Sequence, residues 1–279
     1  MGSTPLYRHS GKVSLLGLLA GGAAALLGAP VLAAIYSLAI AYIPFIYLNL
    51  ILCGLFGAGV GFGVALAMKM GKVRNNFVVV SAAFFATALA HYVGWMVWVA
   101  VMFFRSDVEV PLLAILFPPA FFEIVAQIGR DGVWTIGSSG DPVSGVALWI
   151  VWGIEALIVF GASLAEAYGV ADGDPYCESC ERWCIPPQDV LRLSAHADSQ
   201  TLRARLLDRD VGVLSEATLA AATDLAWHQL DLCQCDTCGG TNTLTLSHVT
   251  LSYDKKGNAR TKKDAQMDRL LLDAEQTQF

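Results

Sequence analysis

Charged residues are scarce in this chain of 279 residues, because Asp, Glu, Lys and Arg make up 15% of it. An ordinary soluble domain carries about 25%. Hydrophobic residues make up 55%, and the mean hydropathy is +0.54. This balance excludes a wholly soluble protein, and it also excludes the collagen-like, coiled-coil and disordered classes.

The common catalytic signatures are also missing. The sequence has no Gly-x-x-x-x-Gly-Lys-Ser/Thr phosphate loop, no Gly-x-Ser-x-Gly turn, no His-Glu-x-x-His pair and no dinucleotide fingerprint in a strand–helix context. These absences disfavour a familiar soluble enzyme without excluding catalysis. We therefore do not expect an enzyme.

The scarcity of charge is uneven along the chain. Residues 1–167 hold 7 Lys and Arg and 7 Asp and Glu, whereas residues 168–279 hold 11 and 17. The first part is neutral and apolar, and the second is acidic. We expect an all-α membrane domain of four transmembrane helices over residues 1–167, followed by a small α+β cytoplasmic domain over residues 168–279.

Long runs without charge locate the four helices. Residues 13–68 form a run of 56 residues without Asp, Glu, Lys or Arg, and a span needs about 20. This run therefore predicts two spans, with a turn at Pro44. The predicted spans are residues 14–42, 46–68, 76–104 and 142–165. In the first span, which is longer than necessary, we expect a kink or tilt at Gly21-Gly22 and Pro30.

Basic residues set the predicted orientation. The cluster of Lys69, Lys72 and Arg74 follows the second span, and by the positive-inside rule it lies in the cytoplasm. Four spans then place both termini in the cytoplasm, most simply at a bacterial inner membrane. A signal peptide is the competing interpretation of the N-terminal run. Residues 105–141 predict an outer interfacial or re-entrant segment; a fifth span there would move the C-terminal part outside.

Glycine pairs four residues apart occur in the first two spans, at Gly17/Gly21, Gly57/Gly61 and Gly59/Gly63. Small residues at this spacing let helices approach closely in a membrane. We expect them to pack the first two spans together, with a homo-oligomer face as the alternative.

Six of the seven cysteines fall in two clusters near the C-terminus, and Cys53 lies inside the second span, where it is expected to be an apolar core residue. Each cluster contains Cys-x-x-Cys, formed by Cys177 and Cys180 and by Cys235 and Cys238. A reducing cytoplasm favours metal ligation over disulfides. Four thiolates suit tetrahedral zinc, which we predict as the cofactor.

The second cluster reads Cys-x-x-Cys-Gly-Gly and is followed by a strand-like run over residues 243–253, a turn at 254–258 and a returning segment at 259–262. This pattern resembles the zinc-ribbon superfamily over about residues 175–262. The resemblance implies a metal-binding role for Cys177, Cys180, Cys235 and Cys238. The 54 residues between Cys180 and Cys235 depart from the family pattern.

Secondary structure in this domain is predicted from local patterns. We expect a helical insertion over residues 185–232, a bulge near residues 247–248 that restores one buried face of the strand, and a last helix over residues 264–274. His196, His228 and His248 are expected to be surface or capping residues rather than ligands.

Cys184 and Cys233 are left over from the two pairs. They could replace a ligand, pair under oxidation or pack in the core, and packing is the expectation for Cys184, beside Trp183. A redox-active Cys-x-x-Cys is the other interpretation, but no βαβ pattern surrounds either motif.

The charge of the second domain limits its partners. Residues 168–279 carry a net charge of −6, which disfavours nucleic acid. The basic residues near the predicted turn are an exception that could meet anionic lipid or simply be solvated; they are Lys255, Lys256, Arg260, Lys262 and Lys263. The expected partners are the lipid bilayer and another protein.

Two ionisable residues lie near the middle of predicted spans. Glu155 is in the fourth span and His91 is in the third, at similar depth. An ionisable group in the bilayer is costly and therefore indicates function by default. A contact between them is available geometrically, and a purely structural hydrogen bond is the alternative.

The functional hypothesis is a membrane-tethered zinc-ribbon module for interaction or sensing. One alternative is a small oligomeric transporter or channel subunit that uses Glu155 and His91. A second alternative is a membrane thiol redox protein.

Overall fold

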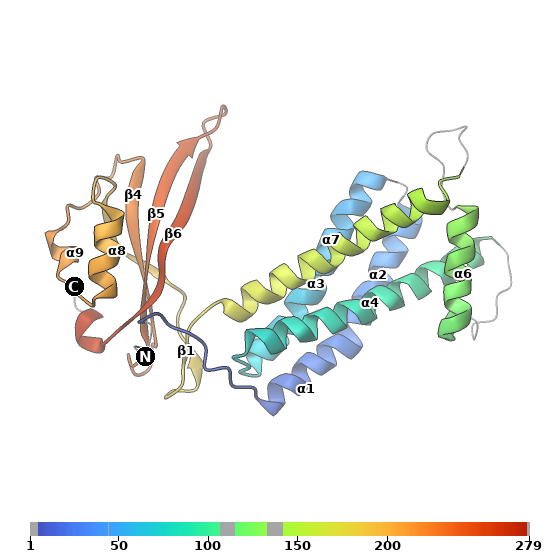
Figure 1. Ribbon diagram of the computed structural model, residues 1–279, viewed down its shortest axis with the longest axis horizontal. Helices are drawn as coiled ribbons and strands as arrows, with labels where there is room; N and C mark the ends of the chain where they lie inside the picture. The colour runs from blue at the N-terminus through green and yellow to red at the C-terminus, as the bar shows by residue number, and fades with distance from the viewer. Residues whose placement is uncertain (1–4, 44, 107–114, 133–141, 278–279) are drawn as a thin grey trace. The chain divides into compact units, whose positions relative to one another are not determined.

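The computed structural model describes residues 5–43, 45–106, 115–132 and 142–277. The chain forms two compact units. One contains residues 11–173 and is helical. The other combines residues 174–277 with residues 5–10 and is built mainly from an antiparallel sheet (Figure 1).

Among its described residues, the helical unit contains four apolar helical segments that are each long enough to cross a membrane. The first comprises α1 (Leu15–Ala23), the π-helical η1 (Ala24–Gly28) and α2 (Ala29–Tyr42); the others are α3 (Ile46–Met70), α4 (Asn76–Arg105) and α7 (Gly145–Asp172). Three of them agree closely with the predicted spans. The last, α7, continues well beyond the predicted end of the fourth span at residue 165.

Local side chains and one irregular turn shape these helices. Ser14 Oγ accepts a hydrogen bond from the Gly17 N–H at 3.0 Å, which caps α1, and Asn75 Oδ1 caps α4 by accepting from the Val78 N–H at 3.1 Å. The π-helical turn η1 lies between the two positions predicted to disturb the first span. Pro30 follows it at the start of α2, so the π-helical turn and the proline lie together in one continuous helical segment.

Glycines of α3 allow close contact with α7. A Cβ atom at Gly57 would lie 2.1 Å from the Val159 carbonyl oxygen, and one at Gly61 would lie 2.1 Å from that of Ser163. Any larger residue would therefore force these two backbones apart. The predicted role in internal packing holds for this pair, but the partner is the fourth span rather than the first.

The glycine pair on α1, Gly17 and Gly21, also packs against other residues of the helical unit. A Cβ atom at Gly17 would lie 2.3 Å from Val73 Cγ2, and one at Gly21 would lie 2.4 Å from Met68 Cγ. The first span therefore meets the end of the second span through these glycines.

A shorter helix, α6 (Pro118–Asp131), lies in the segment between the third and fourth spans. Its 14 residues are too few to span a bilayer, which takes about 20. Pro118 and Pro119 begin this helix instead of interrupting one. Phe121 packs edge-to-face on Tyr92 of α4, with ring centroids 5.2 Å apart. The remaining parts of the predicted interfacial segment, residues 107–114 and 133–141, lie outside the described residues.

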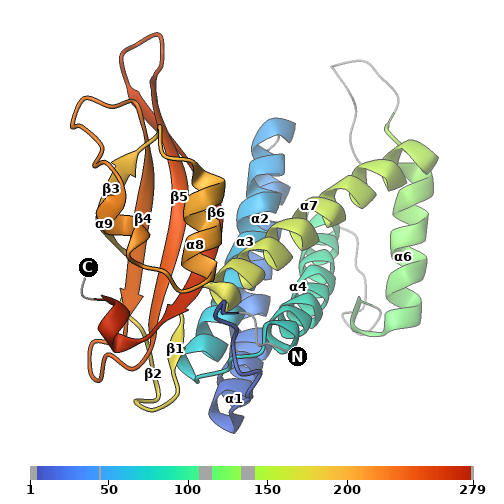
Figure 2. The same ribbon diagram turned by 60° about the vertical axis from the view of Figure 1, so that its left-hand side comes forward.

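The second unit is a four-stranded antiparallel sheet in the order β3-β4-β5-β6, with α8 on one face (Figure 2). Its elements are β1 (Tyr176–Cys177), β2 (Arg182–Trp183), β3 (Gln188–Ser194), α8 (Ser199–Leu207), α9 (Val213–Glu216), β4 (Ala226–Gln234), β5 (Asn242–Tyr253), β6 (Ala259–Leu272) and η2 (Ala274–Thr277). The core between sheet and helix is aliphatic, and its fully buried members are Leu193, Leu206, Leu230, Leu244, Leu246 and Leu270.

The predicted helical insertion over residues 185–232 is wrong at both ends. Its first part is β3 and its last part is β4, so that only α8 and the short α9 are helical. Leu219, which lies in the loop before β4, is 63% exposed. The pattern that matters is the alternation of His228, Leu230 and Leu232, which are all buried on one face of β4.

The predicted helix over residues 264–274 is also wrong, because β6 runs through to Leu272. The buried residues Met267 and Leu270 are three apart, a spacing that is typical of a helix. Here a bulge produces it: Leu244 pairs with Leu270 and Leu246 pairs with Met267, so β6 has one extra residue in this interval. A second extra residue follows, because Ser247 pairs with Ala265. The bulge expected in β5 near residues 247–248 is therefore on the partner strand, and the β4–β5 pairing is uninterrupted.

Residues 5–7 pair with β6 at the edge of the sheet. The Leu271 N–H donates to the Pro5 carbonyl and the Tyr7 N–H donates to the Arg269 carbonyl, both at 2.8 Å, and Leu6 bridges Leu270 in antiparallel fashion. The residues before the first apolar helix and those after the last one therefore belong to one folded unit.

Candidate metal centre

Two tight turns carry the four cysteines predicted to be ligands. The first joins β1 to β2, where Cys177 pairs with Arg182, and it includes Cys180. The second joins β4 to β5 and holds Cys235 and Cys238. We call these turns the first and second knuckle.

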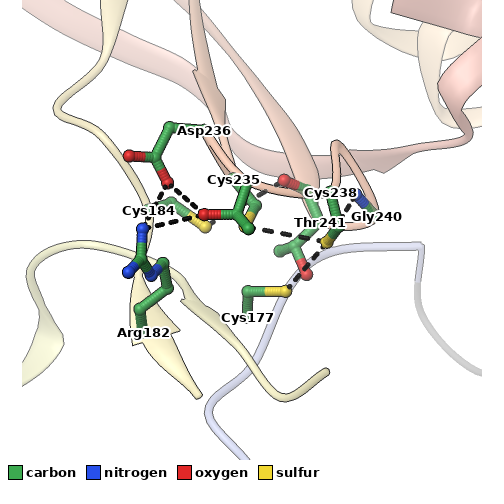
Figure 3. Close-up of polar contacts among 9 residues, drawn as sticks. Cys177, Arg182, Cys184, Cys235, Asp236, Cys238, Gly240 and Thr241 are labelled. Atoms are coloured by element: carbon green, nitrogen blue, oxygen red, sulfur yellow. Dashed lines mark hydrogen bonds and ion pairs between the residues drawn. The ribbon is translucent and has the colours of Figure 1, made fainter. Parts of the chain in front are cut away.

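The second knuckle is closed by backbone hydrogen bonds. The Cys235 N–H donates to the Thr241 carbonyl and the Gly239 N–H donates to the Cys235 carbonyl, both at 3.0 Å. The Gly240 N–H points at the Cys238 sulfur at 3.3 Å (Figure 3). Amide hydrogens aimed at sulfur stabilise a thiolate, which is the form that binds metal.

The four sulfur atoms lie within 4.8 Å of one another and could hold a metal ion. Cys238 Sγ is 3.6 Å from Cys177 Sγ and 3.7 Å from Cys235 Sγ (Figure 3). Zinc–sulfur bonds of about 2.3 Å in a tetrahedron put neighbouring sulfurs about 3.8 Å apart. The spacing therefore suits one tetrahedral ion.

The environment of the thiols differs from one cysteine to the next. Burial raises the pKa of the Cys177 thiol, but hydrogen bonds with Thr241, the Cys180 backbone and the other thiols outweigh it and hold that pKa at about 6. Hydrogen bonding with Cys238, together with burial, raises the pKa of Cys180 to about 12. Metal binding requires deprotonated cysteine, so a bound cation would displace the remaining thiol protons.

Arg182 links the two knuckles. Its Nη1 donates to Thr237 Oγ1 at 2.8 Å and to Asp236 Oδ1 at 3.3 Å, between the cysteines of the second knuckle (Figure 3). The side chains of Arg182 and Asp236 are about half exposed, so the pair adds little free energy. Sequence reasoning missed Arg182 because nothing local marks its role.

Cys184 and Cys233 are buried beside the four-cysteine group but are not part of it. The Cys233 thiol donates to the Ile185 carbonyl at 2.8 Å. Hydrogen bonding with Cys233, followed by burial, raises the pKa of Cys184 and favours its protonated form. Both are free thiols, packed against each other in the core.

The N-terminal segment, residues 5–10, contacts the first knuckle. Tyr7 Oη accepts a hydrogen bond from the Tyr176 N–H at 2.9 Å. The rings of Tyr176 and Trp183 meet edge-to-face at 5.0 Å, and His9 meets Trp183 at 5.9 Å. Sequence reasoning missed this support, because six residues before a long apolar run show no periodic signal.

Glu155 and His91, the two ionisable residues predicted to lie near the middle of spans, have different partners. Tyr36 Oη donates to Glu155 Oε1 at 2.5 Å and lies 3.1 Å from Cys53 Sγ. Trp95 Nε1 donates to His91 Nε2 at 3.3 Å. Among the residues that the structure describes, no hydrogen bond or ion pair joins Glu155 to His91. The predicted contact is therefore replaced by a bond to the first span.

Comparisons with family models, curated proteins and solved structures give no match for this chain.

Proposed function

We propose that this chain is a membrane-anchored zinc-binding module that works through protein interaction or sensing. The observation that carries the proposal is the group of four cysteine sulfurs at the spacing of one tetrahedral ion. Four thiolates in a tetrahedron favour zinc or an iron–sulfur centre among biological metals. Zinc is the better fit, because the sulfurs lie at the separation expected around a single ion.

The metal centre would be structural. Its four positions are all supplied by cysteine, so no position remains open for a substrate. A closed site of this kind contributes to folding and presents a surface. The support from the sequence is the zinc-ribbon resemblance of the second knuckle and the β5–β6 hairpin; β3 and α8, which lie between the knuckles, depart from that pattern.

The pairing of residues 5–7 with β6 supports the proposed topology. These residues precede the first apolar helix and β6 follows the last one, so an even number of spans lies between them. With the basic cluster at Lys69, Lys72 and Arg74, the metal-binding unit is in the cytoplasm, at a bacterial inner membrane.

The same pairing gives the proposed sensory role a physical basis. The metal-binding unit continues covalently into the first span through residue 10 and emerges from the fourth span at residue 174. A change at the first knuckle would reach the first span through Tyr7, and a change in the helices would reach the knuckle by the same route.

Purification in mild detergent tests this proposal. We expect the intact chain to carry zinc and to retain a protein partner, and we expect Cys238→Ser to lose both. Cys53→Ser is the matched control, because Cys53 lies in the helical unit and should change neither. A partner that stays bound to a zinc-free Cys238→Ser chain would refute a role for the metal centre in interaction.

A further inference from the structure

Two histidines on neighbouring strands of the sheet lie side by side, far from the cysteines. His228 on β4 and His248 on β5 are directly opposite in register, and their ring centroids are 5.0 Å apart. His228 is seven residues from Cys235 along the strand, which corresponds to about 23 Å. The pair therefore lies outside the metal centre described above.

The pair occupies the core face of the sheet. His228 has the same orientation as Leu230 and Leu232 and is only 3% exposed, while His248 is half-buried. The burial of His228 contradicts its predicted role as a surface or capping histidine, whereas His248 remains partly exposed. A neutral imidazole is the form that such a site accepts, and burial lowers the pKa of His228 accordingly.

The backbone fixes the tautomer of His228. Its Nε2 lies 3.1 Å from the Ala197 carbonyl oxygen, which can only accept a hydrogen bond, so Nε2 carries the proton. Nδ1 of His228 then presents a lone pair. Nδ1 of His228 and Nδ1 of His248 are both buried, and neither has a hydrogen-bond partner among the described residues.

We propose that His228 and His248 bind a divalent late transition-metal ion through their Nδ1 atoms. An imidazole whose other nitrogen donates to a backbone carbonyl is the arrangement that orients histidine ligands in metal sites. Imidazole nitrogens suit copper, nickel and zinc, with copper bound most strongly. The pair supplies two side-chain ligands.

The charged residues of β6 next to the histidine pair have opposite signs, so they neither attract nor repel a cation strongly. Asp264 on β6 is directly opposite His248, and Lys262 follows two residues further on the same face, opposite Thr250. Affinity must therefore come from the two nitrogens. With two protein ligands against four in the cysteine centre, this site releases its ion much more readily, and it would respond to the supply of metal.

Titration of the full-length protein in detergent tests the proposal. The protein is first loaded with zinc and dialysed, so that the cysteine centre is filled, and Cu²⁺ is then added as the probe. We expect one further ion per chain, with an electron paramagnetic resonance spectrum that shows nitrogen coupling from two imidazoles. His248→Gln and His228→Phe should each weaken this binding at least tenfold.

His196→Gln is the control, because His196 is exposed and should leave the copper site intact. Zinc content and circular dichroism report whether each variant is folded. If His228→Phe does not fold, His248→Gln at the half-buried position still decides the question. No further copper in the wild-type protein, or copper binding that His248→Gln leaves unchanged, would overturn the proposal.

Discussion

Glu181 and Gly239 occupy the same position in the two knuckles, directly after the second cysteine, and both have left-handed backbone with φ of 51° and 59°. The two Cys-x-x-Cys turns therefore share a left-handed residue at this position although their sequences differ. Glycine adopts this conformation without strain, whereas a side chain adds a cost. The first knuckle bears that cost at Glu181.

Gly239→Ala should lower the free energy of unfolding of the metal-binding unit by about 1 kcal/mol. A Cβ atom there would meet nothing within 4 Å, so the backbone alone causes the loss. Gly257→Ala is the matched control, because Gly257 has φ of 80° in the β5–β6 turn. Denaturant unfolding should show a similar loss for both, whereas zinc competition with a chelator should be altered only by Gly239→Ala.

Tyr7→Phe removes the acceptor of the Tyr176 N–H and should reduce stability by about 1 kcal/mol. Tyr253→Phe removes a hydroxyl from an exposed ring and should have no effect. The measurement is thermal unfolding of the full-length protein in detergent, followed by a probe of the sheet. Equal melting temperatures for the two variants would contradict a stabilising role for the hydrogen bond between Tyr7 and Tyr176.

Topology can be measured with reporter fusions after Lys72, Gly132 and Phe279. We expect them to report cytoplasm, outside and cytoplasm, because the proposed arrangement has four spans and because residues 5–7 pair with β6, which keeps both ends in one compartment. An outside signal from the fusion after Phe279 would contradict this arrangement and would favour a fifth span.

Variants of the hydrogen-bonded pair Tyr36 and Glu155 distinguish a structural role for Glu155 from a role in transport. If the carboxyl group only anchors the first span, Tyr36→Phe and Glu155→Gln should each destabilise the helical unit, and the double variant should be less destabilised than the sum. Cellular activity should survive Glu155→Gln. Loss of activity in a Glu155→Gln protein that is stable and assembled would instead support the transport hypothesis.

The sequence predicted the helical unit closely because its signal is local. A run without charge between Lys12 and Lys69 is long enough for two spans, whatever the helices pack against. It was harder to predict which helices pack against each other, because a glycine such as Gly57 allows close contact with any neighbouring helix. Its contact with Val159 of the fourth span depends on the bundle as a whole.

The sheet was predicted poorly because its signals are not local. The bulge in β6 spaces Met267 and Leu270 as a helix would, and only the pairing with Leu244 and Leu246 reveals a strand. The four-cysteine group was nevertheless found, because spacing within each knuckle is short. The hydrogen bond of Tyr7 with Tyr176 could not be predicted without the fold, because it joins residues far apart in the chain.

Metal analysis of the purified full-length protein tests the central claim most directly. After dialysis, the account predicts one zinc per chain for the wild type and for Cys53→Ser, and none for Cys235→Ser. Removal of the ion should also expose the sheet unit to proteolysis while the helical unit stays intact, because a structural zinc site contributes to folding. A metal-free wild-type protein with a fully folded sheet, or full zinc in Cys235→Ser, would contradict it.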